Sequence, residues 1–262
     1  MSTAKHVEIP FPVEIPFAMR PHMRPLGTDE KILTTDHLFV DYIEKKKSAY
    51  DPVYGDNVNR RLIDSAVDAL KKYDSSFSLS ETDGPVYAMT MNLQEDFVVF
   101  APNKKENLSA QILSVCFPSG WNPRKKVNMT FSEIHEPLAD ADLIKKNAEQ
   151  IAKMICTKGP FVRHVWSLSN SGTLGRHPDT VKPWTNETLD QMWYRCERQV
   201  TVPIEGYASL FLIRMYVQPL REVFEDPVKR KSIADSVKSM SDAVIAYKGF
   251  EYLKSYFNQH VV

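Results

Sequence analysis

Four charged side chains on two apolar segments carry much of the chemistry that this sequence could perform. Arg195, Glu197 and Arg198 lie within Trp193–Thr201, and Arg214 lies among apolar residues of the following segment. Charges in the middle of a strand are expensive to bury unless they are paired. They therefore form an internal ion pair, face water or bind a ligand, and a guanidinium group suits a carboxylate. Together the three arginines suggest an anion-binding wall on a sheet.

Histidines supply a second kind of chemistry, because a neutral imidazole binds metals and titrates near neutral pH. His135 lies on a short segment between Ile134 and Pro137. Thr130 and Glu133 have the spacing of a capping box, which predicts a helix that begins at Thr130 and ends at the proline. A ring on so short a segment has little freedom, which suits a metal ligand and equally suits a histidine that caps or packs.

A second histidine, His177, lies on the segment 169–186, which is rich in Ser, Gly, Pro and Thr and shows no hydrophobic period. An unstructured loop of this length is usually functional, for example as a lid. His177 therefore stays open as a metal ligand or as an ordinary surface histidine. The sequence has no Gly-x-Ser-x-Gly elbow, P-loop or Gly-x-Gly-x-x-Gly fingerprint, so neither a serine triad nor a Rossmann site is indicated.

Composition and charge narrow the class of protein. The 262 residues, of which 43% are hydrophobic and 25% are charged, are compatible with one large globular domain. Basic and acidic residues number 33 each, which argues against a dedicated nucleic-acid binder and gives no support for attachment to anionic membranes. The sequence has no apolar run of about 18 residues, so it predicts no membrane span, and the N-terminus does not resemble a secretory signal.

The three cysteines indicate no metal-binding or redox motif. Cys116, Cys156 and Cys196 are far apart and form no Cys-x-x-Cys motif, so neither a structural zinc site nor a thioredoxin-like site is indicated. We expect a cytoplasmic protein with reduced thiols.

Hydrophobic periodicity predicts the elements that position these residues. Helices are expected at 36–47, 59–73, 140–155 and 227–247, and a helix that passes into a strand is expected at 89–100. Strands are expected at 111–117, 161–168, 192–202 and 208–217, with a glycine-containing hairpin connection at 203–207 and a short aromatic tail after residue 249. This order predicts an α+β domain with one mostly antiparallel sheet of about four or five strands.

Residues 1–28 differ from the remainder because they are rich in proline. The sequence Val-Glu-Ile-Pro-Phe occurs at 7–11 and again at 13–17. We predict an extended arm that packs its phenylalanines on a single domain formed by residues 29–262. A partly disordered tail is the alternative.

Six short segments, taken together, resemble the haem-binding α subunit of haem-dependent oxidative N-demethylase, in the dimethylamine monooxygenase-like family. The similarity extends over about Phe11 to Phe250. The segments occur in the family's order and are Cys116-Phe-Pro-Ser-Gly-Trp121, Ile134-His-Glu-Pro137, Val165-Trp-Ser-Leu168, Arg195-Cys-Glu-Arg-Gln199, Ile213-Arg-Met-Tyr-Val-Gln-Pro219 and Ala246-Tyr-Lys-Gly249.

The resemblance implies a PAS-like antiparallel sheet with N-terminal and C-terminal helical elaborations that binds haem b. It implies oxidation of a small amine by dioxygen, with electrons from a separate flavin and iron–sulfur reductase; an oligomer is compatible with it. His135 is implied as the axial iron ligand, with His177 as the alternative. The remaining implied residues are Arg195, Glu197 and Arg198 in catalysis, and Arg214, Trp121, Trp166 and His177 in contact with haem.

Two departures from the family pattern concern the substrate. The family commonly has Arg-x-Asn-Trp where this chain has Arg163-His164-Val165-Trp166, and the loop 169–177 differs from the usual acidic version. Dimethylamine itself is therefore in doubt, and a different amine or a biosynthetic oxidation is compatible with the sequence. Two other functions stay open: a haem-based sensor or carrier without catalysis, and a haem-free module that binds a small organic anion.

Overall fold

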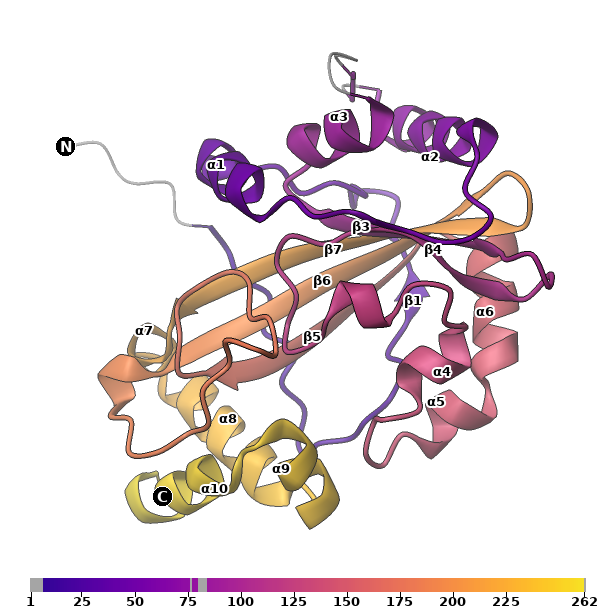
Figure 1. Cartoon of the computed structure of the whole chain (residues 1–262). Helices are drawn as coiled ribbons and strands as arrows, with labels where there is room; N and C mark the ends of the chain where they lie inside the picture. The colour runs from indigo at the N-terminus through magenta and orange to yellow at the C-terminus, as the bar shows by residue number, and fades with distance from the viewer. Residues whose placement is uncertain (1–6, 76, 80–83, 262) are drawn as a thin grey trace.

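The structure is a computed structural model that describes residues 7–75, 77–79 and 84–261. Within these residues seven strands form one antiparallel sheet in the order β1-β5-β6-β7-β3-β4-β2 (Figure 1). In chain order the strands are β1 (Arg24–Pro25), β2 (Val53–Tyr54), β3 (Asp96–Pro102), β4 (Leu108–Ser114), β5 (Phe161–Ser169), β6 (Trp193–Ile204) and β7 (Ala208–Pro219). The predicted α+β class with one antiparallel sheet is confirmed.

The helices lie in separate groups around the sheet (Figure 1). In the described residues they are α1 (Phe39–Ala49), α2 (Arg60–Tyr73), α3 (Pro85–Asn92), α4 (Phe131–His135), α5 (Asp142–Lys146), α6 (Ala148–Thr157), α7 (Leu220–Val223), α8 (Pro227–Ser239), α9 (Asp242–Lys248) and α10 (Glu251–His260). None of them is long and apolar enough to cross a membrane.

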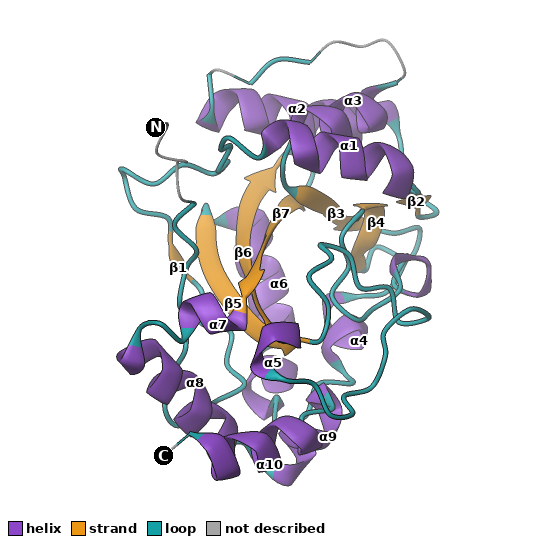
Figure 2. Ribbon diagram, turned by 90° about the vertical axis from the view of Figure 1, so that its left-hand side faces the viewer, coloured by secondary structure: helices purple, strands orange, loops and turns teal. Residues whose placement is uncertain are grey.

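One face of the sheet, here called face A, carries Cys196, Val200 and Leu212 and is covered by helices at both ends. At one end its apolar side chains share a hydrophobic core with α2 and α3. At the other end they share a second core with the helices from α7 to α10. Figure 2 shows these two helix groups at opposite ends of the molecule, with strands of the sheet between them. The opposite face, face B, carries Arg195, Glu197 and the residues that alternate with them.

The long hairpin of β6 and β7 forms as predicted, and its register extends from Trp193 opposite Pro219 to Ile204 opposite Ala208. Its turn has Gly206 at φ +83°, a conformation that glycine adopts without steric cost. The strand predicted at 111–117 is β4, which begins and ends three residues earlier.

Three predicted elements are wrong in their extent. The helix predicted at 140–155 is two helices, α5 and α6, because Asn147 interrupts it by capping α5 with its backbone N–H. The helix predicted at 227–247 also breaks, because the Ser241 hydroxyl accepts a hydrogen bond from Val244 N (3.1 Å) and starts α9. The helix predicted to pass into a strand at 89–100 does so, but α3 begins earlier and ends at Asn92, and β3 follows from Asp96.

The predicted aromatic tail is wrong as well, because these residues form α10. Leu253 and Phe257 are spaced four residues apart and are fully buried in the second core. A pair with this spacing lies on one face of a helix. A single such pair in a short segment does not by itself predict a helix.

The arm packs its phenylalanines on the domain, as expected for an ordered segment. The Phe11 ring lies 5.7 Å from that of Tyr194, and the Phe17 ring lies 6.2 Å from that of Trp166. Residues 1–6 of the predicted arm lie outside the described residues. The division of the chain at residue 28 stays a prediction.

Replacing Asn59 by alanine is expected to lower the free energy of unfolding by about 1 kcal/mol. The Asn59 side chain accepts a hydrogen bond from Leu62 N (3.0 Å) at the start of α2. Urea unfolding measures the change, and Asn59→Asp is the control because it keeps the acceptor. An equal loss in both variants would show that capping is not the cause.

Candidate functional site

Face B of the central strands is incompletely covered. On it Arg163, Val165, Glu197 and Gln199 are only half-buried, whereas Cys196 on face A of the same strand is fully buried. Strand β6 lies inside the sheet between β5 and β7, so its half-exposed side chains face a region that other elements leave open. Strand β5 pairs with β1 only at Phe161 and Val162, so it is an edge strand at Arg163 and Val165. We call these four side chains the floor of the candidate site.

His135 approaches this floor from α4, whose start is the predicted capping box. Thr130 N donates to the Glu133 carboxylate (2.7 Å), and Glu133 N donates to the Thr130 hydroxyl (3.3 Å). The ring of His135 lies 4.1 Å from that of Phe131, and its Nδ1 is 2.7 Å from the Phe131 carbonyl oxygen. Because a carbonyl only accepts, Nδ1 carries the proton and Nε2 keeps a free lone pair.

The surroundings keep this imidazole neutral. Burial is the main cause that lowers the pKa of His135 to about 4; the positive charges of Arg163 and Lys126 act in the same direction, and the hydrogen bond to the Phe131 carbonyl opposes them. The influence of Arg163 also shows that the His135 ring lies within electrostatic reach of the floor. A neutral imidazole with an oriented, available Nε2 is the form that binds a metal.

Glu197 is the negative charge of the floor. Its Oε2 accepts a hydrogen bond from Gln199 Nε2 (2.6 Å). Its charge raises the pKa of two cations, Arg163 and Lys248, in opposition to burial, which lowers both. The loss of solvent has the larger effect on Lys248 and brings its pKa to about 8.

Arg195 lies next to the floor on face B, and its side chain is almost completely buried. Its guanidinium group donates to the carbonyl oxygens of Thr173 (2.6 Å) and Leu174 (2.5 Å) and to the Ser119 hydroxyl (3.3 Å). Burial, with a contribution from the charge of Arg176, lowers its pKa to about 10. Arg195 therefore ties two loops to the sheet, and its buried Nε has no hydrogen-bond partner among the described residues.

These two loops, 115–122 and 169–186, are also joined to each other. Gly120 N donates to Arg176 O (2.8 Å), and Arg176 N donates to Pro118 O (2.6 Å). Together with the end of α1 they surround a cavity of about 800 Å³. Its lining includes Lys45, Asp51, Cys116, Leu174, His177 and Trp193.

Replacing Arg195 by methionine is expected to loosen the loop 169–186 and to lower the free energy of unfolding by about 2 kcal/mol or more, because charge-assisted hydrogen bonds are lost. Hydrogen exchange should become faster at residues 172–177 than elsewhere. The exposed Arg230→Met is the control. Unchanged exchange in the loop would contradict the tie between Arg195 and this segment.

Arg198 and Arg214 lie on face A, so the predicted wall of three arginines is wrong. They face each other in the register of β6 and β7, whereas Arg195 faces Val217. Because side chains alternate along a strand, Arg195 points to the other side of the sheet. Arg198 donates to the carbonyl oxygens of residues 31 and 32, between the two hydrophobic cores.

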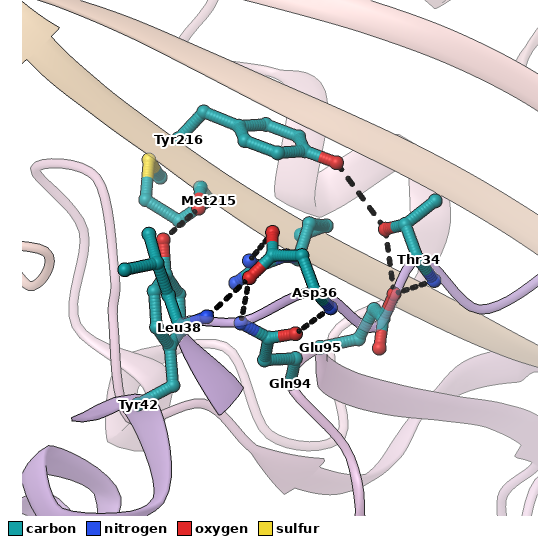
Figure 3. A network of polar contacts seen from close by, with 9 residues as sticks. Thr34, Asp36, Leu38, Tyr42, Gln94, Glu95, Met215 and Tyr216 are labelled. Carbon is teal, nitrogen blue, oxygen red and sulfur yellow. Dashed lines mark hydrogen bonds and ion pairs between the residues drawn. The ribbon is translucent and has the colours of Figure 1, made fainter. Parts of the chain in front are cut away.

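Arg214 belongs to a buried polar network in the same region (Figure 3). It donates to Asp36 Oδ2 (2.8 Å), and its guanidinium carbon lies 3.9 Å from the centre of the Tyr42 ring. Figure 3 shows that Gln94 also bonds to Asp36, through its side-chain amide. The Tyr216 hydroxyl bonds to Thr34, and the network attaches the segment before α1 to β7.

The remaining predicted residues are divided between these regions. Trp121 packs in one cluster with Ile134, next to His135. Trp166 is buried on face A beside Tyr194, away from the floor. His177 lines the cavity under the loops, with Nδ1 3.4 Å from the Asp179 carboxylate and about a third of its side chain exposed.

Two residues, Arg163 and Lys248, were not predicted as site residues. Arg163 faces Gln199 across the pair of β5 and β6, so strand alternation puts it on the face of Glu197. That alternation was the available signal for Arg163. Nothing in the local sequence around Lys248, at the end of α9, indicates that it approaches this face.

A metal at this site would have few protein ligands. No group of three or more His, Cys, Asp or Glu side chains that could hold a metal ion occurs in the described part of the chain. One imidazole nitrogen, that of His135, suits a metal whose other ligands come from a macrocycle.

A comparison with protein-family models agrees with this donor set. The model described as haem-dependent oxidative N-demethylase, alpha subunit-like matches residues 61–257. The match covers well over half of the chain and includes α4, the floor, Arg195 and Lys248.

Proposed function

Because the chain belongs to the haem-dependent oxidative N-demethylase, alpha subunit-like family, we propose that it is a haem-dependent oxidoreductase that oxidises an amine. In this proposal haem b binds against face B, dioxygen is the oxidant, and a separate flavin and iron–sulfur reductase supplies electrons. The description of the fold as PAS-like is part of the same proposal.

The observation that carries the proposal is the tautomer and orientation of the His135 ring. Its Nδ1 donates to the Phe131 carbonyl, and no described residue hydrogen-bonds to its Nε2. A histidine that binds metal usually donates its other ring N–H in this way, because the bond fixes the tautomer and the orientation of the ring. Ile134 and Trp121 provide apolar surroundings nearby, which a macrocycle requires. We therefore propose that His135 would bind the haem iron, and we assign no such role to His177.

When bound, haem would supply the activation of dioxygen and the transfer of electrons. The proposed reaction inserts one oxygen atom of dioxygen into the C–H bond next to nitrogen and reduces the other to water with two electrons and two protons. The carbinolamine that results breaks down to a shorter amine and an aldehyde. Dimethylamine is not assigned as the substrate, because Val165 on the floor replaces the family's usual asparagine.

Glu197 is the side chain of the floor that suits an amine. Its carboxylate would bind an ammonium group and accept the proton that an amine must lose before nitrogen can assist the oxidation of the adjacent carbon. Gln199 holds one carboxylate oxygen in place. Arg195 is proposed to position the two loops, and Arg198 and Arg214 to support face A, so none of the three arginines contacts the substrate.

The test is to reconstitute the protein with haem b and to record its absorption spectrum and its turnover of a series of amines. We expect a sharp Soret band and aldehyde release that depends on dioxygen, on reductase and on the amine. Haem binding without turnover of any amine would favour a sensor or carrier. No haem band would overturn the proposal. The haem-free anion module has lost its main support, because the three arginines do not share a face.

A further inference from the structure

The floor contains a cation that the protein itself does not neutralise. Arg163 lies in the middle of β5, and its Nε is buried without a hydrogen-bond partner in the described part of the chain. A buried donor without a partner costs free energy comparable to a lost hydrogen bond. Burial lowers the pKa of this guanidinium group, which is the expected direction for a cation that has lost its water and gained no close anion.

A second cation approaches from α9. The Lys248 ammonium group lies 5.3 Å from the centre of the Phe17 ring and 5.6 Å from that of Phe250. The two aromatic rings hold the ammonium group in place through cation–π contacts. Among the described residues, no carboxylate lies within ion-pair distance of Lys248, although the charge of Glu197 acts on it.

Glu197 does not satisfy both cations. One of its carboxylate oxygens is occupied by Gln199, and neither Arg163 nor Lys248 forms an ion pair with it within the described residues. Arg163 and Glu197 lie on the same face of the sheet, and Lys248, whose ring neighbours belong to the second core, lies within electrostatic reach of Glu197. The excess is positive, and the buried Nε of Arg163 still requires an acceptor.

We propose that Arg163 and Lys248 form a seat for the carboxylate groups of the bound macrocycle, the two propionates of haem. This inference rests on the proposed function. A guanidinium group binds a carboxylate through paired N–H donors, and an ammonium group on a flexible chain adapts to a second one. Glu197 between them would stay available to the amine, because the propionates neutralise both cations.

The first experiment uses the wild-type protein and two ligands. Titration of the apoprotein with haem b and with its dimethyl ester, which lacks the carboxylate charges, gives two dissociation constants from the Soret band. We expect the ester to bind about 10 to 100 times more weakly, the range for lost charge-assisted hydrogen bonds. Equal affinities for haem and ester would overturn the inference without affecting the assignment of His135.

The second experiment repeats both titrations with Arg163→Gln, Lys248→Gln and the charge-keeping Arg163→Lys. We expect the two glutamine variants to weaken haem binding about tenfold each, to leave the ester unaffected, and Arg163→Lys to keep most of the affinity. The exposed Arg221→Gln is the matched control. Equal losses for haem and ester would mean that the variants only disturb packing, which would overturn the seat.

The alternative partner of Arg163 and Lys248 is a carboxylate group of the substrate. In that case both glutamine variants would bind haem normally and would raise KM for amines that carry a carboxylate but not for simple alkylamines. That result would overturn the assignment to propionates. A wild-type protein that binds neither haem nor ester would instead contradict the proposed function itself, so the two failures are distinguishable.

Discussion

Haem binding should fall by more than about 100-fold when His135 is replaced by glycine, because even loss of a metal ligand's supporting partner costs 10 to 100-fold. The ring is oriented by its contact with Phe131, and its Nε2 is available for a bond to iron. The Soret band of the variant should broaden and shift. Titration of apoprotein with haem measures both effects.

Two controls make this result specific. Added imidazole should enter the space left in His135→Gly and restore much of the wild-type spectrum, since it replaces only the missing ligand. His177→Ala should bind haem normally, because His177 lies on the loop that lines the other cavity, beside Asp179. If His177→Ala loses the band and His135→Gly keeps it, the axial ligand is His177.

A loss of about 3 to 5 kcal/mol in the free energy of unfolding is expected for Lys46→Met, because it leaves a buried carboxylate without its partner. Lys46 is fully buried, and its Nζ lies 3.2 Å from Asp96 Oδ1. The same ammonium group donates to Glu95 O (2.5 Å). Asp96 in turn accepts from Phe117 N (2.7 Å), at the start of the loop that Arg195 holds.

The loss of stability in Lys46→Met should depend on pH. Burial already raises the pKa of Asp96 in the folded protein, and Lys46 opposes this effect. Without Lys46 the pKa of Asp96 in the folded protein rises further. At pH values between the pKa of Asp96 in the unfolded state and its pKa in the folded state, the folded state therefore binds more protons than the unfolded state. Stability of the variant therefore falls as pH rises through this range, and the penalty is smallest in acid.

The neighbouring Lys47→Met is the matched control for urea unfolding at several pH values. Lys47 is exposed and pairs with Glu44 (2.7 Å), so its loss should change stability by less than about 0.5 kcal/mol. A loss in Lys46→Met that is no larger than in Lys47→Met, or that does not vary with pH, would contradict a buried ion pair.

Local patterns predicted much of the fold because each depends only on residues close in the chain. The Thr130 cap, the amphipathic α2 and the alternation along β6 are all of this kind. Breaks within helices were missed because Asn147 closes α5 and Ser241 caps the start of α9 while the hydrophobic period continues across both residues.

The sequence by itself also determined that Arg195 and Arg198 point to opposite faces of β6, because side-chain alternation is a property of a single strand. Only the tertiary structure decided which face stays open and which charges have partners. Arg198 is satisfied by carbonyl oxygens 166 and 167 positions earlier in the chain, whereas Arg163 is left with a buried donor. The physical reason is that desolvation and pairing are set by residues far apart in sequence, which periodicity does not record.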